Sequence, residues 1–222
     1  MVLGIKKIKI LIAILTVFAV FMGTGYAAWA DQLNVGGTVA TGEVNVIFTT
    51  SMLAVPVTDP AGLLSGNARI CEEGKKVEFT LDNLYPGCPA FRLHTVKKNA
   101  GSIPVRLNSA TLSFDDPQNP VIDYLEAKVD ASFCKNPGGT VYAVSDITEE
   151  WFPLVELDDR INASAQLLAA VLEPGGWISL GTVDENGEPQ CLRFRLREDA
   201  PNDTQGRTVV LTLEMDFIQW NQ

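Results

Sequence analysis

Alternation of apolar and polar residues marks four stretches in the middle and at the end of the chain. The apolar positions are Val77, Phe79 and Leu81; Ala110, Leu112 and Phe114; Leu125, Ala127, Val129, Ala131 and Phe133; and Leu211, Leu213, Met215 and Phe217. A period of two places neighbouring side chains on opposite faces of a β-strand. Strands with one apolar face and one solvent-exposed polar face are typical of antiparallel sheets. We therefore predict an all-β chain folded as a two-sheet antiparallel β-sandwich.

Turn signals rich in proline and glycine separate the predicted strands, at 85–87, 136–139, 173–176 and 185–187. One stretch between strands has helical spacing instead, with apolar residues at Ile161, Ala165, Leu168 and Leu172. Asp158 or Asp159 is its predicted N-cap, and Pro174 ends it. A shorter helix is predicted to start at Asp146, with Glu149 as capping-box partner. The sandwich is thus expected to carry a helical insertion near 146–173.

The first thirty residues have the layout of a signal peptide. Three lysines precede an apolar run at 10–22, and small residues follow it at 23–27. This order predicts removal of residues 1–27 by a cut between Ala27 and Ala28; a second candidate cut follows Ala30. Retention as a membrane anchor is the alternative, because residues 10–30 carry no charge and are just long enough to span a bilayer. The prediction is a secreted protein that meets the membrane only through its uncleaved signal peptide.

Composition limits the function classes. The chain has 17 basic and 27 acidic residues, and processing would take its net charge from −10 to −13 because it removes three lysines and no acid. Nucleic-acid binding is not expected, since a phosphate-binding surface needs clustered Lys and Arg. Apolar residues make up 46% of the chain, which is enough for a folded core.

Four cysteines, Cys71, Cys88, Cys134 and Cys191, are predicted to form two disulfides in an exported protein. Sequence leaves three pairings open. Cys71–Cys88 with Cys134–Cys191 is favoured, because the first pair is close in the chain and flanks one strand. A zinc site is the rival interpretation, but the chain has no CxxC pair and a single histidine.

Catalytic chemistry finds little support in the residues. The one histidine, His94, alternates with its strand neighbours and is predicted to face solvent. One histidine excludes HExxH metalloproteases and most Ser-His-Asp arrangements, and no GxSxG, GxGxxG or Walker pattern occurs. We predict no catalytic residue, no enzyme activity and no cofactor. A weak surface Ca²⁺ site at Asp184, Asn186 and Glu188 stays open.

Six short segments, in order along the chain, resemble one family. They are GTGYAAWAD at 23–31, TGEVNV at 41–46, VEFTLDNLYPG at 77–87, NAGSI at 99–103, TQG at 204–206 and IQWN at 218–221. Together they resemble the processing site, first strand, "nLxPGD" turn, "NxGSL" connection and last strand of TasA and camelysin proteins. Cys88 stands where that family usually has Asp, and the four cysteines depart from its common pattern.

The resemblance implies a jelly-roll-like sandwich, cleavage by a SipW-type signal peptidase and assembly into extracellular biofilm-matrix fibres. In such a head-to-tail homopolymer, an N-terminal arm at 28–40 would be the donor strand for the body of the next subunit at 41–222. The apolar donor positions on one face of the extended arm are Trp29, Leu33, Val35 and Val39. Phe217 and Trp220, on the last strand, are the predicted acceptor or packing positions.

Alternative interpretations remain. The arm can be an ordinary first strand that packs on its own sheet. The family's camelysin members are described as surface metallopeptidases, so the resemblance also carries that activity. A monomeric cell-surface module that binds a polysaccharide or a protein is the third possibility.

Overall fold

The computed structural model describes residues 14–17, 42–56, 59–129, 132–144, 146–147, 150–183 and 189–221. The chain divides into two units, Met1–Thr41 and Gly42–Gln222. Residues 14–17 are helical, and none of the described helices is long and apolar enough to cross a bilayer. The predicted cleavage site and donor positions, Ala27, Ala28, Trp29, Leu33, Val35 and Val39, lie outside the described residues.

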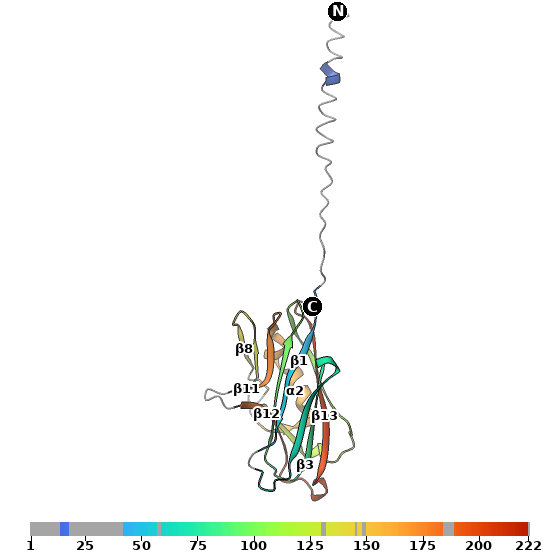
Figure 1. The fold of residues 1–222 in the computed structure, drawn as a ribbon, viewed down its shortest axis with the longest axis vertical. Coiled ribbons are helices and arrows are strands. Elements are labelled where there is room, and N and C mark those ends of the chain that lie inside the picture. The colour runs from blue at the N-terminus through green and yellow to red at the C-terminus, as the bar shows by residue number, and fades with distance from the viewer. Residues whose placement is uncertain are drawn as a thin grey trace, which may run out of the picture. The chain divides into compact units, whose positions relative to one another are not determined.

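Two antiparallel sheets form the body of the molecule (Figure 1). Sheet A runs in the order β8 (Val141–Val144), β7 (Ser132–Lys135), β11 (Trp177–Val183), β4 (Phe91–Asn99), β12 (Pro189–Leu196), β6 (Leu125–Val129) and β9 (Phe152–Pro153), with β1 (Val46–Ala54) also paired to β4. Sheet B runs β10 (Val171–Leu172), β5 (Val105–Phe114), β13 (Arg207–Gln219), β3 (Lys76–Leu84) and β2 (Ser65–Cys71). Short 3₁₀ turns lie at Glu72–Gly74 (η1), Ile122–Tyr124 (η2), Leu154–Glu156 (η3) and Asn202–Thr204 (η4).

The core lies between the two sheets, as the alternation predicts. The side chains of Val77, Phe79 and Leu81 on β3 are fully buried, and so are Leu211 and Leu213 on β13. Across the interface between the sheets, the ring of Phe79 stacks on Phe194 of β12, with ring centroids 5.1 Å apart. The predicted two-sheet antiparallel sandwich is therefore confirmed.

The stripe predicted as one long strand at 125–133 is two strands. β6 pairs with β12, whereas β7 pairs with β11 and β8, so the two strands lie in different branches of sheet A. The apolar stripe in the sequence runs on to Phe133, but the buried phase changes: β6 buries Leu125, Ala127 and Val129, whereas β7 buries Ser132 and Cys134. A period of two therefore cannot reveal where one strand ends and the next begins.

The helical insertion consists of α2 (Leu157–Ala163) and α3 (Ala165–Ala169) rather than one helix to Leu172, which instead belongs to β10. Ser164 interrupts the two, and its hydroxyl accepts a hydrogen bond from the backbone N–H of Leu167 as the cap of α3. Of the helix predicted to start at Asp146, the structure describes residues 146–147, which form a turn, while Glu149 lies outside the described residues. The carboxylate of Asp146 instead accepts hydrogen bonds from the Ser164 hydroxyl and the Gln166 N–H.

Helix α2 covers the outer edge of β5. Asp158, a predicted cap, instead accepts a hydrogen bond from the backbone N–H of Leu112 at 3.1 Å. Asn162 makes two hydrogen bonds to the backbone of Ala110, accepting from its N–H at 2.6 Å and donating to its carbonyl at 2.9 Å. These side chains take the place of a further strand, so this edge of sheet B is closed to pairing.

The predicted disulfides are wrong. Cys71, Cys88 and Cys134 are free thiols. Cys71 lies opposite Lys76 at the start of β3, while Cys88 follows the end of β3 at Leu84, so the length of this strand, about 27 Å, separates them. Sequence proximity misled the prediction, because a strand carries its two flanks apart.

The second favoured pair fails for a similar reason. Cys134 lies opposite Ile178 of β11, and Cys191 lies opposite Gly181 of the same strand. Three residues separate these positions by about 10 Å along the strand, beyond the span of a disulfide. The side chain of Cys191 itself is outside the described set.

We expect the order in which the cysteines are alkylated, without reductant, to follow the burial of their thiols. Cys88 is 3% exposed and Cys134 is 0% exposed, and burial raises the pKa of the Cys134 thiol to about 12. In the native protein Cys71 should therefore react first, with Cys88 and Cys134 reacting only after denaturant is added. Peptide mapping after alkylation, with a reduced sample as the control, measures this order. Recovery of Cys88 or Cys134 as an oxidised pair would contradict the structure.

Candidate functional site: the arm root and the open margin

The body of the molecule begins at a backbone clasp, which we call the arm root. Its two sides are residues 42–45 and the connection 99–103 between β4 and β5. The N–H groups of Ala100 and Gly101 both donate to the carbonyl of Asn45, at 2.7 and 2.9 Å. Ser102 donates its N–H to the carbonyl of Glu43 and accepts from the Glu43 N–H with its hydroxyl, at 3.0 and 2.9 Å. These bonds fix residues 42–45, which follow the predicted arm at 28–40 in the sequence.

Small residues make the arm root possible. A Cβ atom on Gly101 would lie 2.2 Å from the carbonyl oxygen of Glu43, and one on Gly42 would lie 1.9 Å from the side chain of Ile103. Asn99 is fully buried and donates its amide hydrogens to the carbonyls of Ile103 and Leu172. The NAGSI and TGEVNV segments singled out in the sequence therefore meet here.

The two predicted acceptor residues lie near this clasp. The C-terminus and the start of the described body lie at the same end of the sandwich (Figure 1). Trp220 follows β13, donates its N–H to the carbonyl of Pro104 at 3.2 Å, and has a side chain that is 51% exposed. Phe217 is half-buried and packs against the core. Trp220 is thus available to a partner, whereas Phe217 mainly fills the sandwich.

A buried lysine lies beneath the arm root. Lys97 of β4 is 2% exposed, and its ammonium donates a hydrogen bond to the carbonyl of Met215 on β13. The ammonium lies 4.5 Å from the ring centroid of Phe48 and 5.2 Å from that of Phe217. Burial lowers the pKa of Lys97 to about 7, and the nearby Asp216 opposes this shift only in part.

The sequence already carried a sign of Lys97. Phe91, Leu93, Thr95, Lys97 and Asn99 share one phase of the alternation on β4, and all five are buried. A lysine in the apolar phase of a strand indicates a charge inside the core. The burial of Lys97 was not predicted, because only the apolar residues of each stripe were assigned to the core.

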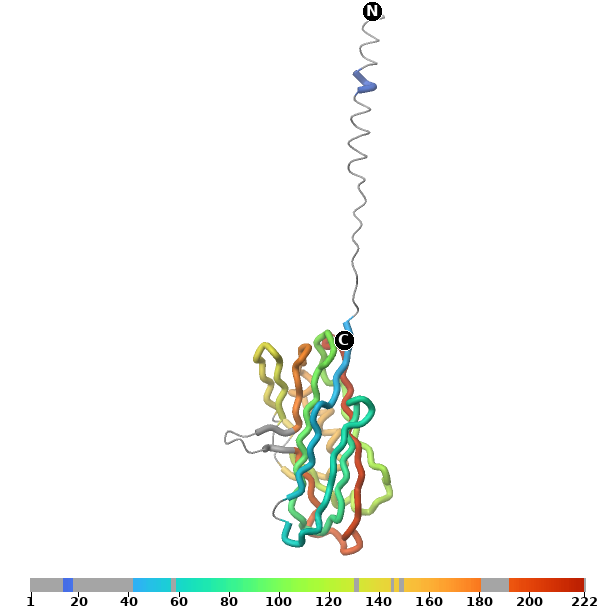
Figure 2. The backbone as a smooth tube through the Cα atoms, viewed as in Figure 1, coloured from blue at the N-terminus to red at the C-terminus, as the bar shows by residue number. Residues whose placement is uncertain are grey.

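Two strand edges lie open on one margin of the sandwich, which we call the open margin. Among the described residues β1 pairs only with β4, and β2 pairs only with β3. Figure 2 shows β1 (blue) running between β4 (green) and the teal strands of sheet B. Gly66 of β2 lies against β1 so closely that a Cβ atom there would be 2.8 Å from the side chain of Leu53.

The strand β1 lacks most of the usual protection of an edge. Its nine residues, VIFTTSMLA, contain no charge, no proline and no glycine. Its side chain at Met52 is 58% exposed. Two features discourage a further strand. The pairing with β4 is irregular between Phe48 and Thr50, and at the start of β1 the ammonium of Lys75 donates a hydrogen bond to the carbonyl of Val46 at 3.2 Å.

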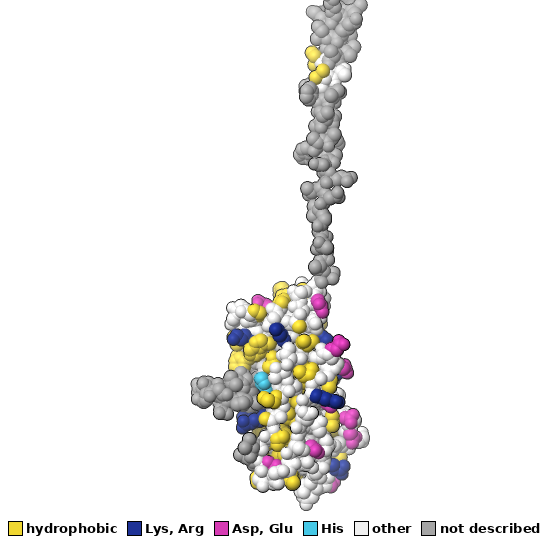
Figure 3. All heavy atoms as spheres, viewed as in Figure 1, with side chains coloured by type: hydrophobic (Ala, Val, Ile, Leu, Met, Phe, Trp, Pro, Cys, Tyr) yellow, Lys and Arg dark blue, Asp and Glu magenta, His cyan; other side chains and the backbone are white. Residues whose placement is uncertain are grey.

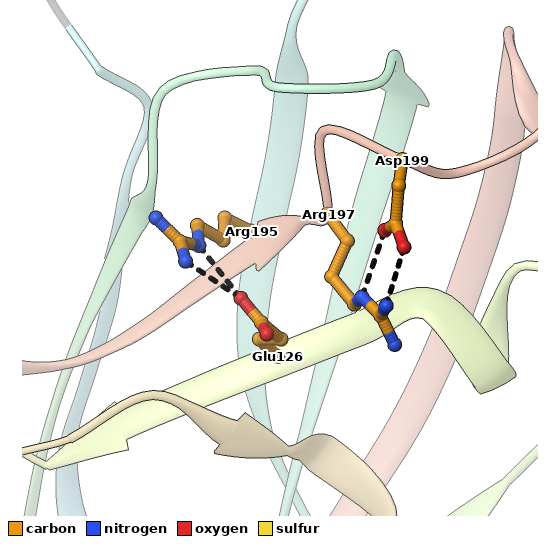
Figure 4. A network of polar contacts seen from close by, with 4 residues as sticks. All are labelled: Glu126, Arg195, Arg197 and Asp199. Atoms are coloured by element: carbon orange, nitrogen blue, oxygen red, sulfur yellow. Dashed lines mark hydrogen bonds and ion pairs between the residues drawn. The ribbon is translucent and has the colours of Figure 1, made fainter.

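A separate group of charged side chains lines a hollow of about 540 Å³ beside Cys88. Figure 4 shows that each arginine points at its own carboxylate: Arg195 binds Glu126 at 2.8 Å, and Arg197 binds Asp199 at 2.5 Å. Both arginines are thus neutralised locally, and burial raises the pKa of the Cys88 thiol. The group is a pair of surface ion pairs beside an inert thiol.

Metal ligands are not gathered in the described part of the chain, where no three His, Cys, Asp or Glu side chains could hold one ion. His94 is half-buried on β4, opposite Met52 of β1. The Ca²⁺ candidates at 184–188 lie outside the described residues.

Comparisons of the chain with models of protein families, with curated proteins and with solved structures find no match. The resemblance to TasA and camelysin proteins stays a prediction from the sequence.

Replacing Lys97 tests its burial directly. Between pH 7 and 10 the unfolded chain keeps Lys97 protonated, while the folded protein releases that proton, so the unfolded state binds more protons. The free energy of unfolding should therefore rise with pH in this window, by up to about 1.4 kcal/mol per unit, and level off below pH 7. Denaturant titrations of Lys97→Met should show this slope reduced.

The matched control is Lys98→Met, which removes the exposed neighbour of Lys97 on the same strand. It should keep the slope of the unmodified protein. Equal slopes for Lys97→Met and the unmodified protein would show that Lys97 is not deprotonated on folding.

Proposed function

We propose that this protein is a secreted structural subunit that polymerises head-to-tail into extracellular fibres. The arm at 28–40 of one subunit adds as a strand to the body of the next. The resemblance of the short sequence segments to TasA and camelysin proteins supports this proposal, as does the signal-peptide layout. A SipW-type signal peptidase would release the arm by cutting between Ala27 and Ala28.

The observation that carries the proposal is the uncharged edge of β1. A long edge strand without charge or proline offers its unpaired N–H and C=O groups to any extended segment of matching length. The arm supplies such a segment, with Trp29, Leu33, Val35 and Val39 on one face of an extended chain.

Strand β2 is the element that the incoming arm would displace. It lies beside β1, and none of its seven residues is buried. Moving β2 away from β1 therefore exposes little apolar area. The arm would then pair with β1 and cover Met52, which is 58% exposed.

Geometry favours an open chain of subunits over a closed ring. Residues 42–45, which follow the arm in sequence, are clasped to their own body, whereas the open margin that would receive a strand is formed by β1 and β2. A contact between two different surfaces repeats without closing, and so it makes a filament.

Substitutions in the arm test the donor. Leu33→Asp with Val35→Asp places two charges on the proposed donor face, so fibres seen by negative-stain microscopy should disappear while the monomer stays folded. Gln32→Asp with Asn34→Asp is the matched control, because it adds the same charge on the opposite face and should keep the fibres. Fibres of normal length and number from the first variant would refute the donor role of the arm.

Substitution of the edge tests the acceptor. Met52→Lys adds a charge to the exposed part of β1, and the initial rate of fibre growth should fall about tenfold because edge lysines oppose strand addition. Leu63→Lys is the control, because Leu63 is also 58% exposed but lies before β2 and outside any strand. Equal growth rates for the two variants would place the acceptor elsewhere.

A further inference from the structure

The outer face of sheet A is basic, although the chain as a whole carries a net charge of −10. Among the described strand residues on this face, six are basic and one is acidic. The bases are Arg92, Lys98, Lys128, Lys135, Arg193 and Arg195, and the acid is Glu126. Arg195 is neutralised by Glu126. The acidic stretch at 184–188 lies outside the described residues.

The bases form two rows across the strands. In the first row Lys135 of β7 and Lys98 of β4 both lie opposite Trp177 of β11. In the second row Arg92 of β4 and Lys128 of β6 both lie opposite Arg193 of β12. Six residues of β4, about 20 Å, separate the two rows.

Like charges directly opposite each other destabilise an antiparallel pair. Four of these bases, Arg92, Lys98, Lys128 and Lys135, make no side-chain ion pair or hydrogen bond with a described residue. Elsewhere Arg69, Lys76 and Arg160 are each paired with a glutamate. The face thus concentrates uncompensated positive charge in an acidic protein, which points to an anionic partner.

The side chains between the rows suit sugars. Trp177 is half-buried between its two lysines, and an aromatic face stacks on the apolar face of a sugar ring. Figure 3 shows dark blue side chains above and below the histidine (cyan), with yellow side chains between them. Four bases spread over this distance are too few and too dispersed for the phosphate backbone of a nucleic acid.

A hollow of about 330 Å³ lies at the second row, lined by the side chains of Arg92 and Arg193 together with apolar residues such as Val55 and Pro89. The guanidinium of Arg92 beside an apolar wall can hold a carboxylate by charge-assisted hydrogen bonds. The hollow has the size of a small-ligand site and is large enough for a sugar residue.

We propose that the outer face of sheet A binds a linear polysaccharide that carries carboxylate groups. Sugar rings stack on Trp177, carboxylates bind the bases of the two rows, and the hollow at Arg92 receives one acidic sugar. This inference does not rest on fibre formation, because a monomer also presents this face.

Binding of polygalacturonate to the mature full chain tests the proposal. We expect saturable binding that weakens as salt is raised, with little binding of the uncharged glucan dextran. Arg92→Gln with Lys128→Gln should weaken binding about tenfold, and Trp177→Leu about fivefold. Arg69→Gln with Lys76→Gln, on the outer face of sheet B, is the matched control and should stay within about twofold of the unmodified protein.

Three results would overturn the proposal. They are unchanged affinity of the Arg92→Gln, Lys128→Gln variant, equal binding of dextran and polygalacturonate, and binding of single-stranded DNA without binding of polygalacturonate. The charge variants replace exposed or half-buried side chains, so circular dichroism should show the unmodified fold. They keep the test decisive even if Trp177→Leu unfolds.

Discussion

The pairing of β4 with three other strands is the constraint on which the rest of the molecule depends. β1 binds along one edge of β4, while β11 and β12 share its other edge, through Thr95–Lys98 and Phe91–Leu93. The inner face of β4 carries Lys97 and Asn99 under the arm root, and its outer face carries Arg92 and Lys98. One strand therefore positions the edge of β1, the clasp on residues 42–45, and the basic face.

Elements governed by local chemistry were predictable from the sequence. The stripes on β3 and β13 are buried as their alternation predicts, and Gly87 adopts a φ of +71° in the turn where Cys88 donates its N–H to the carbonyl of Tyr85. Features set by distant partners were not. Leu172 has helical spacing but belongs to β10, because it pairs with Val105 of β5. The cysteine pairs failed because sequence spacing does not measure distance across a sheet, and Lys97 was missed because its burial depends on Phe48 and Phe217.

The charges of the chain are distributed in a way that fits a subunit both soluble and selective. A net charge of −10 keeps copies apart at long range, while the nine residues of β1 carry no charge at all. In the proposed fibre, association would then depend on the short-range match between the extended arm and the edge of β1. The basic face of sheet A adjoins that edge, because Ile47 and Ala54 of β1 lie opposite Lys98 and Arg92, and Ala54 lines the hollow at Arg92.

Hydrogen–deuterium exchange of the mature protein, compared between monomer and fibre, tests the central claim most directly. If the arm of one copy pairs with β1 of the next, the amides of residues 28–40 and of β1 gain protection together in the fibre, while those of β5, already covered by β13 and α2, change little. Fibres in which β1 exchanges as fast as in the monomer would contradict the account.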